Sequence, residues 1–155
     1  MLKKILVPLD GSQLAETALS HATELAQKFD ASLLLVWVIQ SQSARMMTEF
    51  GAVSFHLEDM KRFEEDMFTH ATDYLKDIQT QLEAQQINVA FKTLIYHSVA
   101  DGIVTIASDE AVDLIVKTTH GRSGPSRWFF GNVAMKVLQQ SPCPVYLVRV
   151  SGRDE

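Results

Sequence analysis

The amino-acid sequence predicts an α/β protein whose parallel β-sheet is covered by helices on both faces. Short apolar runs of strand length alternate with longer segments that repeat apolar residues at helical spacing, which is the pattern of strand–helix–strand units. One run, residues 33–39, is apolar at every position, as strands buried on both sides of a sheet are. Such units connect through right-handed crossovers. Neither a linker nor an internal repeat interrupts the pattern, so residues 1–155 are expected to form a single domain.

Five apolar runs predict the strands of this small open sheet, at residues 3–8, 32–39, 88–96, 112–118 and 143–150. Apolar residues at helical spacing predict helices at residues 14–29, 58–85, 98–108 and 132–140. Ser12 and Ser98 stand where two of these helices begin, and a serine there is expected to cap the first turn. Gly102 is expected to weaken its helix slightly.

The longest predicted helix carries an apolar stripe, which we assign to core packing rather than to a cofactor. The stripe consists of Met60, Phe63, Met67, Ala71, Tyr74, Ile78 and Leu82. The charged residues among them are assigned to a solvated face: Lys61, Arg62, Glu64, Glu65 and Asp66. Residues 40–57, before this helix, are predicted to form a long loop or flap without firm structure. Loops of this length are often functional, although simple sequence variability explains one equally well.

Composition and charge exclude several classes of function. The formal net charge is -5, which argues against a general nucleic-acid binder, because such proteins show a basic face. The chain has no run of eighteen apolar residues, so no segment is expected to span a membrane. The single cysteine, Cys143, cannot form an internal disulfide, which fits a reducing cytosol and predicts a cytoplasmic protein. We expect Cys143 to be a small buried hydrophobe rather than a nucleophile.

A glycine-bearing basic loop, residues 118–133, joins the fourth predicted strand to the last helix. Glycine lets backbone approach a ligand closely, and the unpaired N–H groups of a helix start favour an anion. Arg122 and Arg127 add positive charge between Gly121 and Gly131, so a phosphate is the natural guest. The alternative is a loop that merely turns the chain. The loop lacks the sequence of a P-loop and that of a dinucleotide-binding turn.

Residues after three of the strands are expected to meet at one edge of the sheet. Asp10, Val38 and Gly121 lie at or beyond the carboxyl ends of the first, second and fourth strands, where ligands bind in open α/β sheets. Asp10 could instead serve only as the turn residue before the first helix. His120 could touch phosphate, but shaping the turn is the simpler role. Neither a nucleophilic Ser, His and Asp set nor a zinc cluster of His and Cys is recognisable in the sequence.

Three stretches together resemble the universal stress protein family: residues 5–12, residues 120–124 and residues 141–145. They lie at the family's separations, and the resemblance covers nearly the whole chain. It implies a five-stranded parallel sheet in the order 3-2-1-4-5, of the adenine nucleotide alpha hydrolase-like type. It also implies dimers, which in this family commonly pair through the last strand. One branch of the family binds ATP and another does not.

The ATP-binding branch that this chain resembles carries a sequence pattern of Gly, two residues, Gly, nine residues, Gly, and then Ser or Thr. Gly121 and Gly131 match this pattern, whereas Thr118 and Asn132 depart from it. Asn132 is a mild change, because an amide can cap a helix and donate to phosphate. Thr118 is a larger change, since it brings a branched side chain to where backbone would approach the ribose.

The resemblance also assigns roles to residues of this chain. Asp10 would contact the nucleoside, the Val38 backbone would lie by the adenine, and Pro8 would shape the pocket wall. Backbone N–H groups near Gly121 and at the start of the last helix would hold phosphates. The full candidate nucleotide site is Pro8, Leu9, Asp10, Val38, Thr118, His120, Gly121, Arg122, Gly131, Asn132 and Val133.

These observations favour an adenine-nucleotide-binding regulatory protein of the stress response, with ATP or AMP as the ligand. Magnesium could accompany a bound triphosphate, although no dedicated metal ligands are recognisable. The alternatives are a dimeric interaction module that binds no nucleotide and an enzyme. We rank the enzyme last, as at most a slow ATPase, because no residue is placed as a strong general base. The apolar run Val145–Val150, at the edge of the sheet, predicts a homodimer through the last strand.

Overall fold

A computed structural model describes residues 1–50, 57–119 and 131–149 of the chain. Five parallel strands form one sheet in the order β3-β2-β1-β4-β5, as expected. The strands are β1 (Lys4–Pro8), β2 (Ser32–Gln40), β3 (Val89–Tyr96), β4 (Leu114–Thr118) and β5 (Val145–Val148). The helices are α1 (Gln13–Phe29), α2 (Gln42–Phe50), α3 (Leu57–Glu83), α4 (Val99–Asp109) and α5 (Asn132–Gln140).

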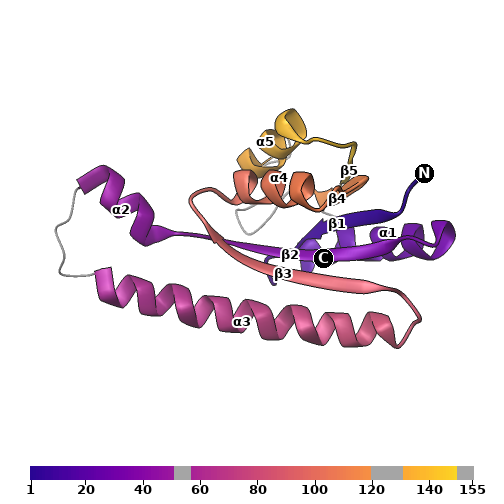
Figure 1. Ribbon diagram of the computed structural model, residues 1–155, viewed down its shortest axis with the longest axis horizontal. Coiled ribbons are helices and arrows are strands. Elements are labelled where there is room, and N and C mark those ends of the chain that lie inside the picture. Colours follow the sequence, from indigo (N-terminus) through magenta and orange to yellow (C-terminus); the bar gives the residue numbers. More distant parts are fainter. Residues whose placement is uncertain (51–56, 120–130, 150–155) are drawn as a thin grey trace, which may run out of the picture.

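Helices cover both faces of the sheet, and each face has its own core. Figure 1 shows α1 and α3 on one face and α4 and α5 on the other. On the first face, buried alanines of α1, such as Ala18 and Ala22, let that helix pack closely on the sheet. On the second face, Ile103 of α4 and Val137 of α5 pack against the central strands. The buried positions of β1 and β2 are apolar because helices cover both faces of the sheet.

The order of the strands sets the position of the site. The chain steps from β1 through β2 to β3 on one side, and then crosses to β4 and β5 on the other. Because the direction of winding reverses next to β1, the connections after β1 and β4 diverge and open a crevice at their carboxyl ends. This crevice is the place where the sequence predicted a ligand.

The helix starts confirm two predicted caps. Ser12 accepts a hydrogen bond from the Ala15 N–H through its hydroxyl at 3.2 Å. Ser98 accepts one from the Asp101 N–H at 3.4 Å. Each serine satisfies one of the donors that a helix start leaves without an internal partner.

The prediction of an unstructured segment at residues 40–57 was wrong in part, because α2 occupies its first half. Figure 1 shows α2 beyond the end of the sheet, beside the start of α3. The prediction that Glu64 is solvated was also wrong, since its side chain is only 6% exposed. Its carboxylate accepts hydrogen bonds from the Ser41 hydroxyl at 3.1 Å and from the Ser43 N–H at 2.9 Å. These two serines lie where the chain enters α2, so the buried carboxylate ties the start of α2 to α3.

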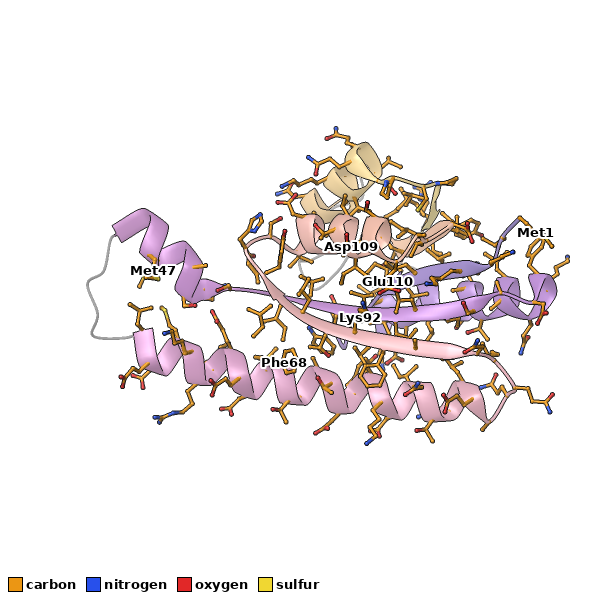
Figure 2. The ribbon with its side chains drawn as sticks, in the orientation of Figure 1. Met1, Met47, Phe68, Lys92, Asp109 and Glu110 are labelled. Atoms are coloured by element: carbon orange, nitrogen blue, oxygen red, sulfur yellow. The ribbon has the colours of Figure 1, made fainter. Side chains whose placement is uncertain are left out.

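The apolar stripe of α3 faces the sheet only along its later turns. Ala71, Ile78 and Leu82 are buried as predicted, and Leu75 joins them. Phe63, predicted to be core, is 59% exposed because the first turns of α3 run past the end of the sheet. Met47 of α2 is also exposed, and so is Phe68 farther along α3 (Figure 2).

The last strand is shorter than the predicted 143–150, since β5 is Val145–Val148 and Val150 lies outside the described residues. Cys143 is half-buried against the core of the α4 and α5 face, and so is less enclosed than expected. Within the described ranges, none of the helices combines the length and the apolarity that a membrane crossing needs.

Candidate functional site

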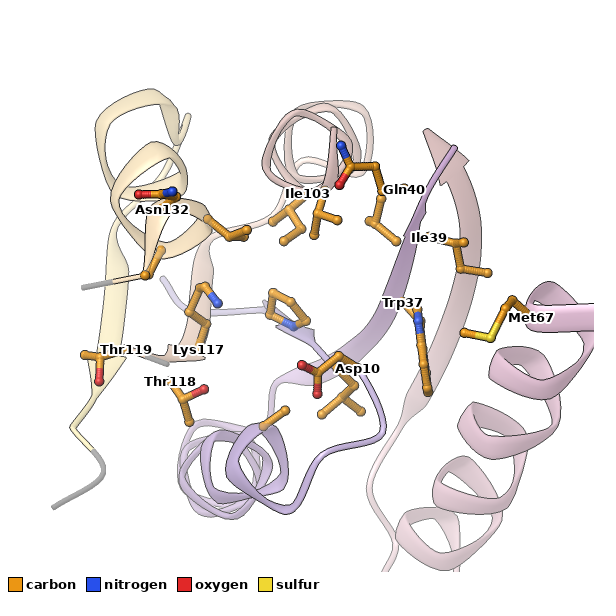
Figure 3. Close-up of a pocket in the computed structure, with 18 of the residues that line it drawn as sticks. Asp10, Trp37, Ile39, Gln40, Met67, Ile103, Lys117, Thr118, Thr119 and Asn132 are labelled. Atoms are coloured by element: carbon orange, nitrogen blue, oxygen red, sulfur yellow. The ribbon is translucent and has the colours of Figure 1, made fainter. Parts of the chain in front are cut away.

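A pocket of about 610 Å³ lies at the carboxyl ends of β1, β2 and β4 (Figure 3). Eight of the residues expected at the nucleotide site line it: Pro8, Leu9, Asp10, Val38, Thr118, Gly131, Asn132 and Val133. The other three, His120, Gly121 and Arg122, lie outside the described residues. The structure thus brings together residues that are more than a hundred positions apart in the sequence.

Asp10 occupies the turn between β1 and α1, and its two carboxylate oxygens have different surroundings. Oδ1 accepts hydrogen bonds from the Ser12 N–H at 3.0 Å and from the Ser12 hydroxyl at 2.5 Å. Oδ2 accepts none from the residues that the structure describes. Asp10 therefore has the predicted turn role through one oxygen, while the other remains available to the pocket that the residue lines.

Position 11, between Asp10 and Ser12, requires glycine because of its backbone conformation and because a neighbouring side chain lies close to it. Gly11 has a φ of 77°, a region that side-chain-bearing residues rarely adopt. A Cβ there would lie 2.7 Å from Cη2 of Trp37, a residue that also lines the pocket. The turn that presents Asp10 is thus packed directly against the indole ring.

One wall of the pocket is apolar and consists of Val38 on β2 with Val99 and Ile103 on α4. Gly102 explains how closely these elements approach, because a Cβ there would lie 2.7 Å from Cγ1 of Val38. The sequence indicated only the cost of this glycine to its helix. We call this the β2–α4 wall, defined by Val38, Val99, Gly102 and Ile103.

The opposite wall is polar and consists of the end of β4 and the start of α5. Gly131 is the N-cap of α5, makes no side-chain cap and donates its N–H to the Thr119 carbonyl at 3.1 Å. The first N–H groups of a helix have no internal partners, and those of Asn132 and Val133 belong to residues that line the pocket. This geometry suits an anion. We call this the β4–α5 wall, defined by Lys117, Thr118, Gly131, Asn132 and Val133.

Lys117 is the member of this wall that sequence reasoning missed. It is the fourth residue of β4, and Figure 3 shows its side chain entering the pocket. Burial lowers the pKa of its ammonium group, an effect that the nearby Asp10 carboxylate partly opposes. Of the described lining residues, Asp10 and Lys117 are the two that carry charge. A lysine directly after the apolar run 114–116 was the available signal.

Metal binding has no visible basis in the described chain, where no three His, Cys, Asp or Glu side chains are grouped as a metal site would need. The donors on the β4–α5 wall and the single carboxylate of Asp10 instead match an anionic organic ligand with hydroxyl groups. An apolar wall opposite would accommodate a flat ring.

Comparisons with known proteins agree with this architecture. Universal stress protein MJ0531 of Methanocaldococcus jannaschii is 29% identical over 150 residues, which cover 96% of this chain and 83% of that protein. A putative universal stress protein of Staphylococcus saprophyticus, SSP1056, is 30% identical over 158 residues, covering 99% of this chain and 87% of its own length.

Solved structures show the same fold. The structure of MJ0577 superposes with a TM-score of 0.82 at 27% identity, and the match covers 98% of this chain and 99% of that one. A universal stress protein solved in complex with cAMP superposes with a TM-score of 0.64 at 18% identity, over 97% and 98% of the two chains. The family model of the universal stress proteins matches residues 1–149, which is nearly the whole chain. The chain therefore belongs to the universal stress protein family.

Proposed function

We propose that this protein is a regulatory module of the stress response that binds an adenine nucleotide, ATP or AMP, in the pocket. The observation that carries the proposal is the pairing of an apolar wall with an open helix start across a single cavity. The adenine would lie against the β2–α4 wall, the ribose would face Asp10, and the phosphates would meet the first N–H groups of α5. Magnesium would enter only with a bound triphosphate.

The size of the pocket and one relative support this assignment. A volume of about 610 Å³ falls within the range of small-molecule sites, roughly 300 to 1,000 Å³. A relative of the same fold has been solved in complex with cAMP, an adenine nucleotide. Asp10 Oδ2 could accept from the hydroxyls of a ligand, because Oδ1 is the oxygen that Ser12 holds.

Titration calorimetry with AMP, ADP, ATP and cAMP tests the proposal. We expect a dissociation constant of roughly 1 μM for the best ligand, which corresponds to about 8 kcal/mol. Thermal unfolding in the presence of nucleotide provides an independent readout, because a ligand bound only by the folded state raises Tm. If millimolar nucleotide gives no binding heat and no rise in Tm, this function is excluded.

We also propose that occupancy, rather than turnover, is the output of the site. Asp10 is the sole carboxylate among the described lining residues, and it is engaged in a turn. Any ATP hydrolysis should therefore be far slower than the roughly 10 per second of a typical enzyme. A rate near that value that is lost on changing one side chain would contradict this.

The proposed partner is a second copy of the chain, bound through the edge strand β5. Among the residues that the structure describes, this strand ends the sheet and has β4 as its hydrogen-bonded neighbour. The outer edge of β5 pairs with no other strand within the described ranges, so it is available for pairing with a second chain. Sedimentation should give the mass of two chains, and Leu147→Lys should reduce it to one. A wild-type protein that sediments as a single chain at high concentration would refute the dimer.

The dimeric interaction module remains the second candidate, and Thr118 is the residue that favours it. Its branched side chain replaces the family's glycine in the pocket. A protein that dimerises but takes up no nucleotide would have this function.

A further inference from the structure

We propose that Lys117 makes the pocket select a phosphate-bearing nucleotide over the neutral nucleoside. The inference rests on the proposed nucleotide function and concerns which part of the ligand is read. Lys117 lines the pocket, although it belongs neither to the glycine pattern of the family nor to a helix cap.

The strand register directs Lys117 into the pocket. Ile115, two residues earlier on β4, packs in the core of the α4 and α5 face, and residues two apart share a face. The Lys117 side chain therefore leaves the sheet on the side of α5, and Figure 3 shows it in the cavity near Asn132. This position lies below the open start of α5.

The ammonium group of Lys117 destabilises the ligand-free protein, because it is partly removed from water and none of the described residues forms an ion pair with it. In the part of the chain that the structure describes, it makes neither a hydrogen bond nor an ion pair. Asp10 attracts it across the cavity without direct contact. Other lysines differ, since Lys4 meets Glu110 at 3.3 Å and Lys136 meets Asp101 at 2.8 Å. A half-buried charge that is partly removed from water without a partner is unfavourable, and an anionic ligand would supply the partner.

The surroundings of Lys117 specify the kind of anion. The ammonium group and the first N–H groups of α5 are all donors on one wall, so they can share the oxygens of one phosphate. Asp10 lies on the other side and repels negative charge, which leaves it to accept from hydroxyl groups. The two charged side chains thus give the pocket a polarity that matches a sugar phosphate, with its hydroxyls toward Asp10 and its phosphate toward Lys117.

Calorimetry on the full-length chain with AMP and adenosine tests the inference, using wild type, Lys117→Met and Lys92→Met. Lys92 pairs with Glu110 and does not line the pocket (Figure 2). Lys92→Met changes the net charge by the same amount as Lys117→Met and therefore serves as the control. Lys117→Met should weaken AMP binding by at least roughly tenfold, the ratio expected for one hydrogen bond to a charged group, and adenosine binding by less than about twofold. Lys92→Met should change neither.

Other outcomes separate this inference from the proposed function. If Lys117→Met binds AMP as tightly as wild type, or loses AMP and adenosine equally, selection by Lys117 is refuted while nucleotide binding stands. If wild type binds neither compound, the nucleotide function fails, and inorganic pyrophosphate becomes the probe. A rise in Tm with pyrophosphate in wild type that is lost in Lys117→Met would sustain the role of Lys117 as the anion-binding group. No rise in wild type would overturn it.

Discussion

The two walls of the pocket differ in chemistry: one is formed by apolar packing and the other by charged and polar donors. The β2–α4 wall is apolar and closely packed, and Gly102 is there because Val38 leaves no space for a side chain. The β4–α5 wall contains a half-buried cation and a helix start without a side-chain cap, and a Cβ on Gly131 would have ordinary contact at 3.6 Å with the Thr119 carbonyl. The first wall contributes stability to the fold. The second has donors at the start of α5 that no described residue uses, so its substitutions should separate binding from stability.

Gly102→Val should produce the largest loss of stability, because the new side chain must displace Val38 or α4. Overpacking of this kind costs about 1–3 kcal/mol, and each 1 kcal/mol lowers Tm by roughly 2–4 °C in a domain of this size. Gly131→Val is the matched variant on the other wall. It should cost stability about 0.5–1 kcal/mol through the poorer N-cap and yet weaken nucleotide binding strongly.

Thermal unfolding and calorimetry on this pair measure both effects. The comparison of the walls fails if Gly131→Val unfolds as early as Gly102→Val. It also fails if Gly131→Val binds AMP as well as wild type, since the start of α5 would then be only a turn.

Lys117→Met should raise the stability of the free protein, the opposite of its expected effect on binding. The folded pKa of Lys117 is lowered, whereas the unfolded chain titrates near 10.4. Between these two values the unfolded state binds more protons, so the wild-type stability contributed by this group rises with pH. Urea unfolding should therefore show a gain for Lys117→Met at pH 7 that shrinks as the pH approaches roughly 10.

Lys92→Met again serves as the control, because exposed ion pairs contribute only about 0–1 kcal/mol. A loss of stability in Lys117→Met at pH 7 would show that packing of the lysine stem outweighs burial of its charge. The β4–α5 wall would then resemble the β2–α4 wall.

Asn132→Ala should have a smaller effect, confined to binding. The side chain lines the pocket and is exposed at the first turn of α5, while the N-cap itself is Gly131. Loss of one hydrogen bond to phosphate should cost about 0.5–1.5 kcal/mol, roughly a two- to twelvefold weaker AMP complex. Gln140→Ala, exposed at the other end of the same helix, is the control, and equal losses in the two variants would contradict a direct contact.

The walls also differ in how far the sequence predicted them. The apolar strands, the two serine caps and the glycine spacing near the ligand are local patterns, and the structure confirms the strands and the caps. Lys117 was missed because a strand pattern does not say which face a residue shares with the start of a distant helix. Glu64 was misplaced for a similar reason. Helical spacing placed Glu64 on a charged face. Its hydrogen-bond partners Ser41 and Ser43 lie at the start of α2, which only the tertiary structure places beside α3.

Thr118→Gly should have the smallest effect on binding, although Thr118 is itself buried at the end of β4. Glycine restores the family's pattern and removes a branched side chain from the pocket, so AMP affinity should stay unchanged or improve. Stability should fall by about 1 kcal/mol, because glycine loses more conformational freedom on folding and leaves its strand unpacked. Thr118→Ser, which keeps the hydroxyl, separates the role of the methyl group from that of the hydroxyl. If glycine weakens AMP binding as much as Gly131→Val does, the threonine side chain is part of the ligand site. If wild type binds nothing and Thr118→Gly binds ATP, the β4–α5 wall retains its geometry but has lost its ligand, and the interaction module becomes the function of this chain.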